Sequence, residues 1–125
     1  MAASRDTIRE TINRYVDYIA KGTTDQILSL FAAGATVEDP VGSEVRTTRE
    51  SIREFYAQFE GRNPATTLGP VKIAGDRQAA FSFEVTVQDS GMTYTIAPID
   101  VMTFDDDGLI TSMRAFWGDE DLAIS

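Results

Sequence analysis

The sequence contains no cysteine and no histidine. Without cysteine, the chain has no disulfide framework and no thiolate ligands for a structural zinc site. Without histidine, it cannot form a Ser-His-Asp or Cys-His catalytic group, and it lacks the commonest ligand of transition metals. Acid–base chemistry must therefore come from Asp, Glu, Tyr or Lys side chains, and we expect neither a metal ion nor a cofactor.

Basic residues are also scarce, and the formal net charge is −9. Nucleic acids and anionic membranes both attract basic surfaces, so we expect neither as a partner. No apolar run is long enough to span a bilayer, and the first residues lack the apolar segment of a secretory signal, so we expect a cytoplasmic protein. The length fits one domain covering residues 1–125.

The first half of the chain has the periodicity of amphipathic helices. We predict one helix over residues 7–21, beginning with a capping box of Thr7 and Glu10. A second, shorter helix is predicted between Thr24 and Gly34, and a third over residues 48–59. The apolar positions that support them are Ile8, Ile12, Tyr15, Val16, Ile19, Ile27, Leu28, Leu30, Phe31, Ile52, Phe55, Tyr56 and Phe59.

The second half of the chain changes to a period of two, which is typical of strands. Residues 79–88, AAFSFEVTVQ, alternate strictly between apolar and polar. Residues 92–104 are predicted as the next strand, with an irregular point at Pro98, and residues 109–117 as the last. Between them, DDDG is predicted as a turn, because it lacks the ligand spacing of a calcium loop. Helices followed by hairpin-linked strands indicate an α+β fold, with the helices on one side of a curved antiparallel sheet.

Asp100 is an acid in the middle of an apolar strand, TIAPIDVMTF. An ionised, unpaired carboxylate in such a place would cost several kcal/mol, and a buried acid usually shifts its pKa and stays neutral. A buried acid of this kind marks either an ion pair or a functional group. The flanking residues leave both interpretations open.

Three further residues are candidates for a site with Asp100, namely Tyr15, Asp39 and Tyr56. The tyrosines lie on the apolar faces of predicted helices, where most tyrosines are core residues whose hydroxyl reaches a polar edge. Asp39 precedes a proline, where aspartate is common for turn reasons. Glu38 is a rival to Asp39, because side chains alternate along an extended segment and only one of the two can face inward.

Several stretches, in the same order and covering nearly the whole chain, resemble the bacterial ketosteroid isomerases, small enzymes with the NTF2-like cone fold. The stretches are RYVDYIAKG, LFAAGATVEDPVGSE, IREFYAQF, APIDVMTF and SMRAFWGDEDL. The resemblance implies about three N-terminal helices packed on a strongly curved, mostly antiparallel sheet. It also implies a homodimer formed through the sheet. Some members carry a further tyrosine where this chain has Phe31, so the hydrogen-bond network is expected to be shorter here.

The resemblance implies isomerisation of a 3-oxo-Δ5-steroid to its conjugated Δ4 isomer, with a small-molecule steroid as the partner. Asp39 would move the proton from C4 to C6. Tyr15 and a protonated Asp100 would donate hydrogen bonds to the dienolate oxygen, and Tyr56 would orient Tyr15. The apolar lining is expected to come from Phe31, Phe83, Val85, Val87, Met113 and Trp117.

Fold alone does not fix function, so other activities remain open. One is a different enzyme on the same fold, such as a polyketide cyclase or an epoxide hydrolase. Another is a non-catalytic protein that binds a steroid or another small ligand. A glycosidase-type carboxylate pair would need a polar cleft around Asp39 and Asp100, whereas their neighbours are apolar.

Overall fold

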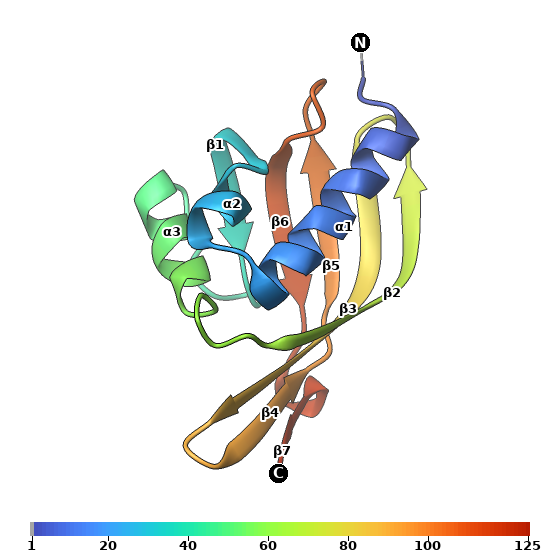
Figure 1. The fold of residues 1–125 in the computed structure, drawn as a ribbon. Helices are drawn as coiled ribbons and strands as arrows, with labels where there is room; N and C mark the ends of the chain where they lie inside the picture. The colour runs from blue at the N-terminus through green and yellow to red at the C-terminus, as the bar shows by residue number, and fades with distance from the viewer. Residues whose placement is uncertain (1) are drawn as a thin grey trace.

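The computed structural model describes residues 2–125 and has the α+β class predicted from the sequence, with helices covering one face of a curved sheet (Figure 1). Within this range no helix is long and apolar enough to cross a membrane. The helices are α1 (Arg5–Lys21), α2 (Thr24–Leu28) and α3 (Arg49–Ala57), followed late in the chain by a 3-10 turn (Asp119–Asp121). The strands are β1 (Phe31–Glu38), β2 (Ala65–Ala74), β3 (Gln78–Asp89), β4 (Met92–Ile96), β5 (Ile99–Phe104), β6 (Ile110–Phe116) and β7 (Leu122–Ile124).

Strand β3 organises the seven-stranded sheet. Its first half pairs with β5 and its second half with β4, while β2 runs antiparallel along its other edge. Beyond β5 lie β6 and then β1, which pair in parallel, and β7 pairs with β4. Because β4 and β5 pair with opposite ends of β3, the sheet bends between them. The β3–β4 hairpin therefore projects beyond the body formed by the helices (Figure 1).

Helix α1 begins earlier than predicted. Its N-cap is Ser4, whose hydroxyl oxygen accepts a hydrogen bond from the Thr7 backbone N–H at 3.1 Å. The predicted capping box of Thr7 and Glu10 is therefore wrong. Serine is among the best N-cap residues, and the earlier start places Asp6 near the positive end of the helix dipole.

The second predicted helix is wrong in its second half. Helix α2 ends at Leu28, and Phe31 begins strand β1 instead of continuing the helix to Gly34. The carbonyl oxygen of Leu30 accepts a hydrogen bond from the Ile110 N–H at 2.8 Å, and Phe31 pairs with Ile110 in the parallel ladder. A short apolar run fits a helix and a strand equally well, and here the pairing with β6 decides.

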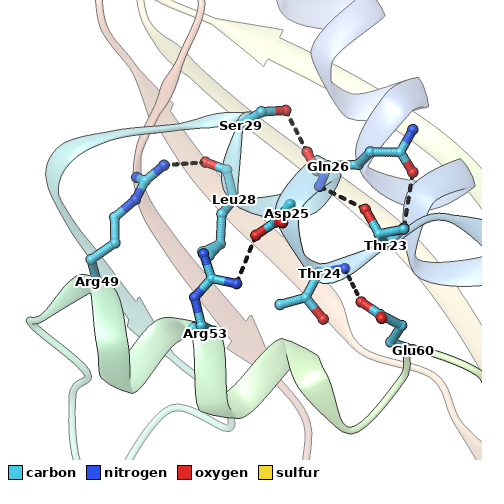
Figure 2. A network of polar contacts seen from close by, with 9 residues as sticks. All are labelled: Thr23, Thr24, Asp25, Gln26, Leu28, Ser29, Arg49, Arg53 and Glu60. Carbon is cyan, nitrogen blue, oxygen red and sulfur yellow. Dashed lines mark hydrogen bonds and ion pairs between the residues drawn. The ribbon is translucent and has the colours of Figure 1, made fainter.

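Helix α3 is fixed against α2 by polar contacts (Figure 2). Arg49 donates from Nη2 to the Leu28 carbonyl oxygen at 2.7 Å, and Arg53 forms an ion pair with Asp25 at 2.7 Å. The helix is slightly shorter than the predicted residues 48–59, because Thr48 is its N-cap and Ala57 its last residue. These contacts hold the inner face of α3, which carries the fully buried Tyr56, over the sheet.

The predicted strand over residues 92–104 is interrupted where Pro98 marked an irregular point. It divides into β4 and β5, and the Pro98 carbonyl oxygen accepts a hydrogen bond from the Phe83 N–H at 3.1 Å. The DDDG segment is a turn as predicted, in which Asp105 Oδ1 accepts from the Asp107 and Leu109 N–H groups. Strands β2 and β7 were not predicted from the sequence.

Candidate active site

A cavity of about 390 Å³ opens between the helices and the inner face of the sheet. Its volume lies within the usual range of small-molecule sites, roughly 300–1,000 Å³. Three of the residues selected from the sequence line this one cavity, although Tyr15 lies on α1, Asp39 directly follows β1 and Asp100 lies on β5. The rest of the interior lining is mostly apolar, and these three side chains supply its polar groups.

Tyr15 and Tyr56 form a buried hydroxyl pair. Their oxygens are 2.8 Å apart, and the rings meet edge to face with centroids 5.9 Å apart. Tyr15 faces the cavity, whereas Tyr56 lies behind it and is not part of the lining. Burial is the main cause that raises the pKa of both phenols well above the ordinary range, so both hydroxyls stay protonated and can donate hydrogen bonds.

Asp100 is buried in strand β5 with only 2% of its surface exposed. Its neighbour Ile99 points to the other face of the sheet and is 52% exposed, so the strand is apolar on both faces but buried only on one. Among the described residues, Asp100 Oδ1 has no hydrogen-bond partner. Burial, followed by the charge of Asp39, raises the pKa of Asp100 well above the ordinary range. No cation pairs with this carboxyl among the ion pairs of residues 2–125, and the setting favours a neutral acid.

Asp39 is held by Trp117, which was expected to contribute only apolar lining. The Trp117 Nε1–H donates to Asp39 Oδ1 at 2.7 Å across 78 residues of sequence. Burial raises the pKa of Asp39, and the hydrogen bond from Trp117 opposes that shift. Asp39 is thus the more easily ionised of the two cavity carboxyls, because its carboxylate accepts the Trp117 hydrogen bond, whereas Asp100 has no such donor among residues 2–125.

Glu38 faces away from the cavity. Its Oε1 accepts a hydrogen bond from Arg114 Nε at 3.0 Å, and its Oε2 accepts one from the Gly42 N–H at 3.0 Å. The hydrogen bond from Gly42, followed by that from Arg114, lowers the pKa of Glu38. Of the two adjacent carboxylates, only Asp39 lines the cavity.

Arg46 is a cation near Asp39 that sequence reasoning missed. Its backbone pairs with Val37, and its Nη1 donates to the Ser51 carbonyl oxygen at 2.8 Å. The guanidinium lies over the Phe55 ring, 5.3 Å from the centroid. Fixed in this way, Arg46 is the second group that lowers the pKa of Asp39. The antiparallel bridge to Val37 turns the chain back and brings Arg46 beside Asp39, and neither a helical nor an alternating pattern marks this bridge in the sequence.

The apolar wall was predicted in part. Phe83, Val85, Val87 and Trp117 line the cavity, as expected from alternate positions on a strand. Phe31 and Met113 do not, which corrects the expected lining. Met113 lies on the inner face of the sheet but is completely buried in the core beside Met102, and the Phe31 ring packs against both tyrosines, with centroids 6.4 Å from Tyr15 and 5.6 Å from Tyr56.

Further lining residues were not predicted. Phe55 and Phe59 belong to the helical face that carries Tyr56, and that spacing could have indicated them. The rest of the apolar wall comes from Ile19 of α1, Ile96 of β4, Pro98 and Leu122 of β7. The pairing of β7 with β4 was not predicted from the sequence. Four polar residues complete the lining at the exposed side, namely Gln58, Arg62, Asp89 and Tyr94.

The sequence is similar to one protein family and to two enzymes of known name. Residues 12–113 match the family model of the SnoaL-like domain. The chain is 44% identical to the steroid Delta-isomerase of Nocardioides simplex over 94% of this chain and 95% of that protein. It is 31% identical to the epoxide hydrolase LasB of Streptomyces lasalocidi, over 98% of this chain but only 51% of that protein.

Solved structures agree on the fold. One is the epoxide hydrolase/cyclase-like enzyme SalBIII, which acts in pyran ring formation in the polyether salinomycin. It has a TM-score of 0.91 and 26% identity, with 98% of both chains covered. The structure of RV0760c from Mycobacterium tuberculosis has a TM-score of 0.88 at 15% identity, covering 98% of this chain and 99% of that one, and shows the fold alone. Together with the family match, these structures confirm the predicted NTF2-like fold.

Proposed function

The chain belongs to the SnoaL-like family of the NTF2-like superfamily, and we propose that it is a steroid Delta-isomerase that converts 3-oxo-Δ5-steroids into 3-oxo-Δ4-steroids. The 44% identity to a steroid Delta-isomerase over most of both chains supports an isomerase. One arrangement carries the proposal: an apolar cavity holds one carboxyl that accepts a hydrogen bond, that of Asp39, and a second, that of Asp100, whose buried Oδ1 has no hydrogen-bond partner among residues 2–125.

Asp39 acts as the general base. It removes the weakly acidic proton at C4 of the steroid, and the electrons move into a dienolate whose negative charge lies on the 3-oxygen. Asp39 then returns the proton to C6, which displaces the double bond into conjugation. Positioned general-base catalysis is typically worth about 10²–10⁴-fold. The hydrogen bond from Trp117 holds the carboxylate in place and keeps its pKa from rising further.

Tyr15 and Asp100 stabilise the dienolate oxygen. A carboxylate would repel this oxygen, whereas a neutral carboxylic acid donates a hydrogen bond to it. Ketosteroid isomerases are the established example of an acid kept neutral for this purpose. The burial of Asp100, which raises its pKa, supports the same role here. Tyr56 acts through its hydrogen bond to Tyr15 and is a positioning residue.

We also propose that the protein forms a homodimer through the outer face of the sheet. Ile99 and Phe116 lie opposite one another on β5 and β6, and they remain 52% and 42% exposed. Large apolar side chains that cluster on a sheet face not covered by helices favour association with a second copy. Sedimentation equilibrium tests this assignment, since a monomer at micromolar concentration would contradict it.

An epoxide hydrolase or cyclase is the main rival, because LasB and SalBIII share the fold. Such an enzyme would also use buried acids, but it would not need a phenol and a neutral acid directed at one developing oxyanion. A non-catalytic binder is the other rival. The binder would tolerate loss of Asp39 with little effect, whereas the isomerase would lose most of its turnover.

The test is an ultraviolet assay with a 3-oxo-Δ5-steroid, because conjugation creates a strong new absorbance. We expect turnover by the wild type and a loss of at least about 10²–10⁴-fold for Asp39→Asn, with steroid affinity retained. Glu38→Gln is the matched control and should keep nearly wild-type turnover, since Glu38 faces away from the cavity. Folded wild-type protein that produces no absorbance would refute the proposed activity. Full turnover by Asp39→Asn would refute its role as the base.

A further inference from the structure

The sheet-side wall of the cavity runs from the buried acids to a polar opening. Phe83, Val85, Val87 and Asp89 are alternate residues of β3, and all four line the cavity. The Phe83 ring lies beside that of Tyr15, with centroids 6.2 Å apart. Asp89 lies six residues farther along the same strand. This wall therefore leads away from the oxyanion site towards the β3–β4 hairpin.

The helix-side wall runs in the same direction. Phe55, Phe59 and Arg62 follow α3 and the turn after it, and all three line the cavity. Arg62 Nη1 lies 3.3 Å from Asp89 Oδ2, and both side chains are about half exposed. The two walls thus converge on one ion pair at the mouth of the cavity, at the end opposite to Tyr15 and Asp100.

The mouth retains unused hydrogen-bond donors. A guanidinium has five N–H groups, and only Nη1 of Arg62 is engaged by another side chain within residues 2–125. The Tyr94 hydroxyl also has no hydrogen-bond partner among residues 2–125, and Tyr94 lines the cavity as well. Donors without protein partners, placed around a site that is otherwise apolar, are suited to fixing one polar group of a ligand.

We propose that Arg62, assisted by the Tyr94 hydroxyl, determines specificity by donating hydrogen bonds to an uncharged oxygen acceptor, such as a C17 ketone, at the far end of the steroid. This inference rests on the proposed function, which places the 3-oxygen between Tyr15 and Asp100 and so directs the opposite end of the rings towards the mouth. Arg62 can only donate hydrogen bonds, so the ligand atom must accept.

The charges at the mouth favour a neutral substituent over an anionic one. Asp89 already compensates the charge of Arg62, and an anionic group bound there would be repelled by this carboxylate. The formal net charge of −9 also disfavours the approach of an anionic ligand. A ketone oxygen accepts hydrogen bonds from the free N–H groups of Arg62, and it carries no charge that would compete with Asp89 for the guanidinium.

The experiment compares kcat/KM for a 3-oxo-Δ5-steroid with a ketone at C17 and for the same steroid with CH2 there. We expect the wild type to prefer the ketone. Arg62→Met should lower this preference about tenfold through KM, which corresponds to about 1.4 kcal/mol for one hydrogen bond from a charged donor. Arg62→Lys should restore part of the preference. Arg14→Met is the matched control, since Arg14 pairs with Glu10 on the surface of α1 and should leave the preference unchanged.

Asp89→Asn separates ligand recognition from a structural role of the ion pair. It breaks the pair but leaves the donors of Arg62, so the preference for the ketone should persist. Equal losses for both steroids in Arg62→Met, or loss of the preference in Asp89→Asn, would overturn the inference. A wild-type preference for a C17 carboxylate over the ketone would also overturn it. If the wild type turns over neither steroid, the proposed function fails; if it turns over both without preference, only the present inference does.

Discussion

Asp100 permits a strict test, because its proposed role depends on its protonation state. A neutral acid and an amide both donate a hydrogen bond, whereas a methyl group cannot. Asp100→Ala should therefore lower kcat by about 10²–10³-fold, or about 2.7–4 kcal/mol, the usual cost of losing one oxyanion donor. The loss should lie towards the lower end, because water that enters the vacated space replaces part of the interaction. Asp100→Asn should retain much of the activity.

The assay is the ultraviolet measurement of kcat at neutral pH for the wild type and both variants. A kcat that falls from the wild type to Asp100→Asn and then to Asp100→Ala is expected only if Asp100 donates a hydrogen bond. If Asp100 were an ionised partner of a cation, Asn would break the pair about as severely as Ala. Equal losses in the two variants would therefore refute the reasoning. A carboxylate band for Asp100 in isotope-edited infrared spectra, with a phenol bound as an oxyanion mimic, would refute it independently.

The same residue makes a prediction about stability against pH. Burial and the charge of Asp39 raise the folded-state pKa of Asp100, so below the unfolded value of about 3.9 both states bind the proton. Above that value the unfolded state releases the proton first, and the free energy of unfolding falls as pH rises, by up to about 1.36 kcal/mol per pH unit, until the folded pKa is passed. Urea unfolding of the wild type minus that of Asp100→Asn should show this negative slope. A flat or positive difference would contradict a neutral Asp100.

Two other variant sets test the rest of the site. Tyr15→Phe should cost about 10²–10³-fold in kcat through loss of a donor, whereas Tyr56→Phe should cost much less because it acts through Tyr15; equal losses by the same assay would disprove this hierarchy. Trp117→Phe removes the hydrogen bond that opposes the raised pKa of Asp39, so the acid limb of the kcat–pH profile should move to higher pH. A limb that stays in place would show that Trp117 does not tune the base.

The sequence indicated the site more fully than the strand order. Asp100 was recognisable as a buried acid because its flanks are apolar, and burial of a carboxyl has few explanations. The helical spacing around Tyr15 and Tyr56 and the alternation around Phe83 placed these side chains on inward faces. Local periodicity carries this information, since it depends only on which side of an element is covered.

Long-range pairing supplied what the sequence could not. Phe31 fits a helical pattern, but it begins strand β1, which pairs in parallel with β6 about 80 residues away along the sequence. Met113 occupies an inward position as predicted, yet it pairs with Met102 in the packed core. A period of two identifies the face of a strand. Whether that face meets a cavity or a helix depends on the path of α1 over the sheet.

Residue 31 is phenylalanine, so it has no hydroxyl that could form a hydrogen bond with the pair of Tyr15 and Tyr56. Tyr56 is completely buried, and among residues 2–125 its hydroxyl has one hydrogen-bond partner, the oxygen of Tyr15. If Tyr15 donated in this pair, the Tyr56 proton would be buried without an acceptor, at a cost of about 1–3 kcal/mol. We therefore infer that Tyr56 donates and that the Tyr15 proton is left for the cavity. Phe31, 5.6 Å from the Tyr56 ring, offers no competing acceptor. A phenylalanine there thus favours a Tyr15 that donates to the oxygen of a bound ligand.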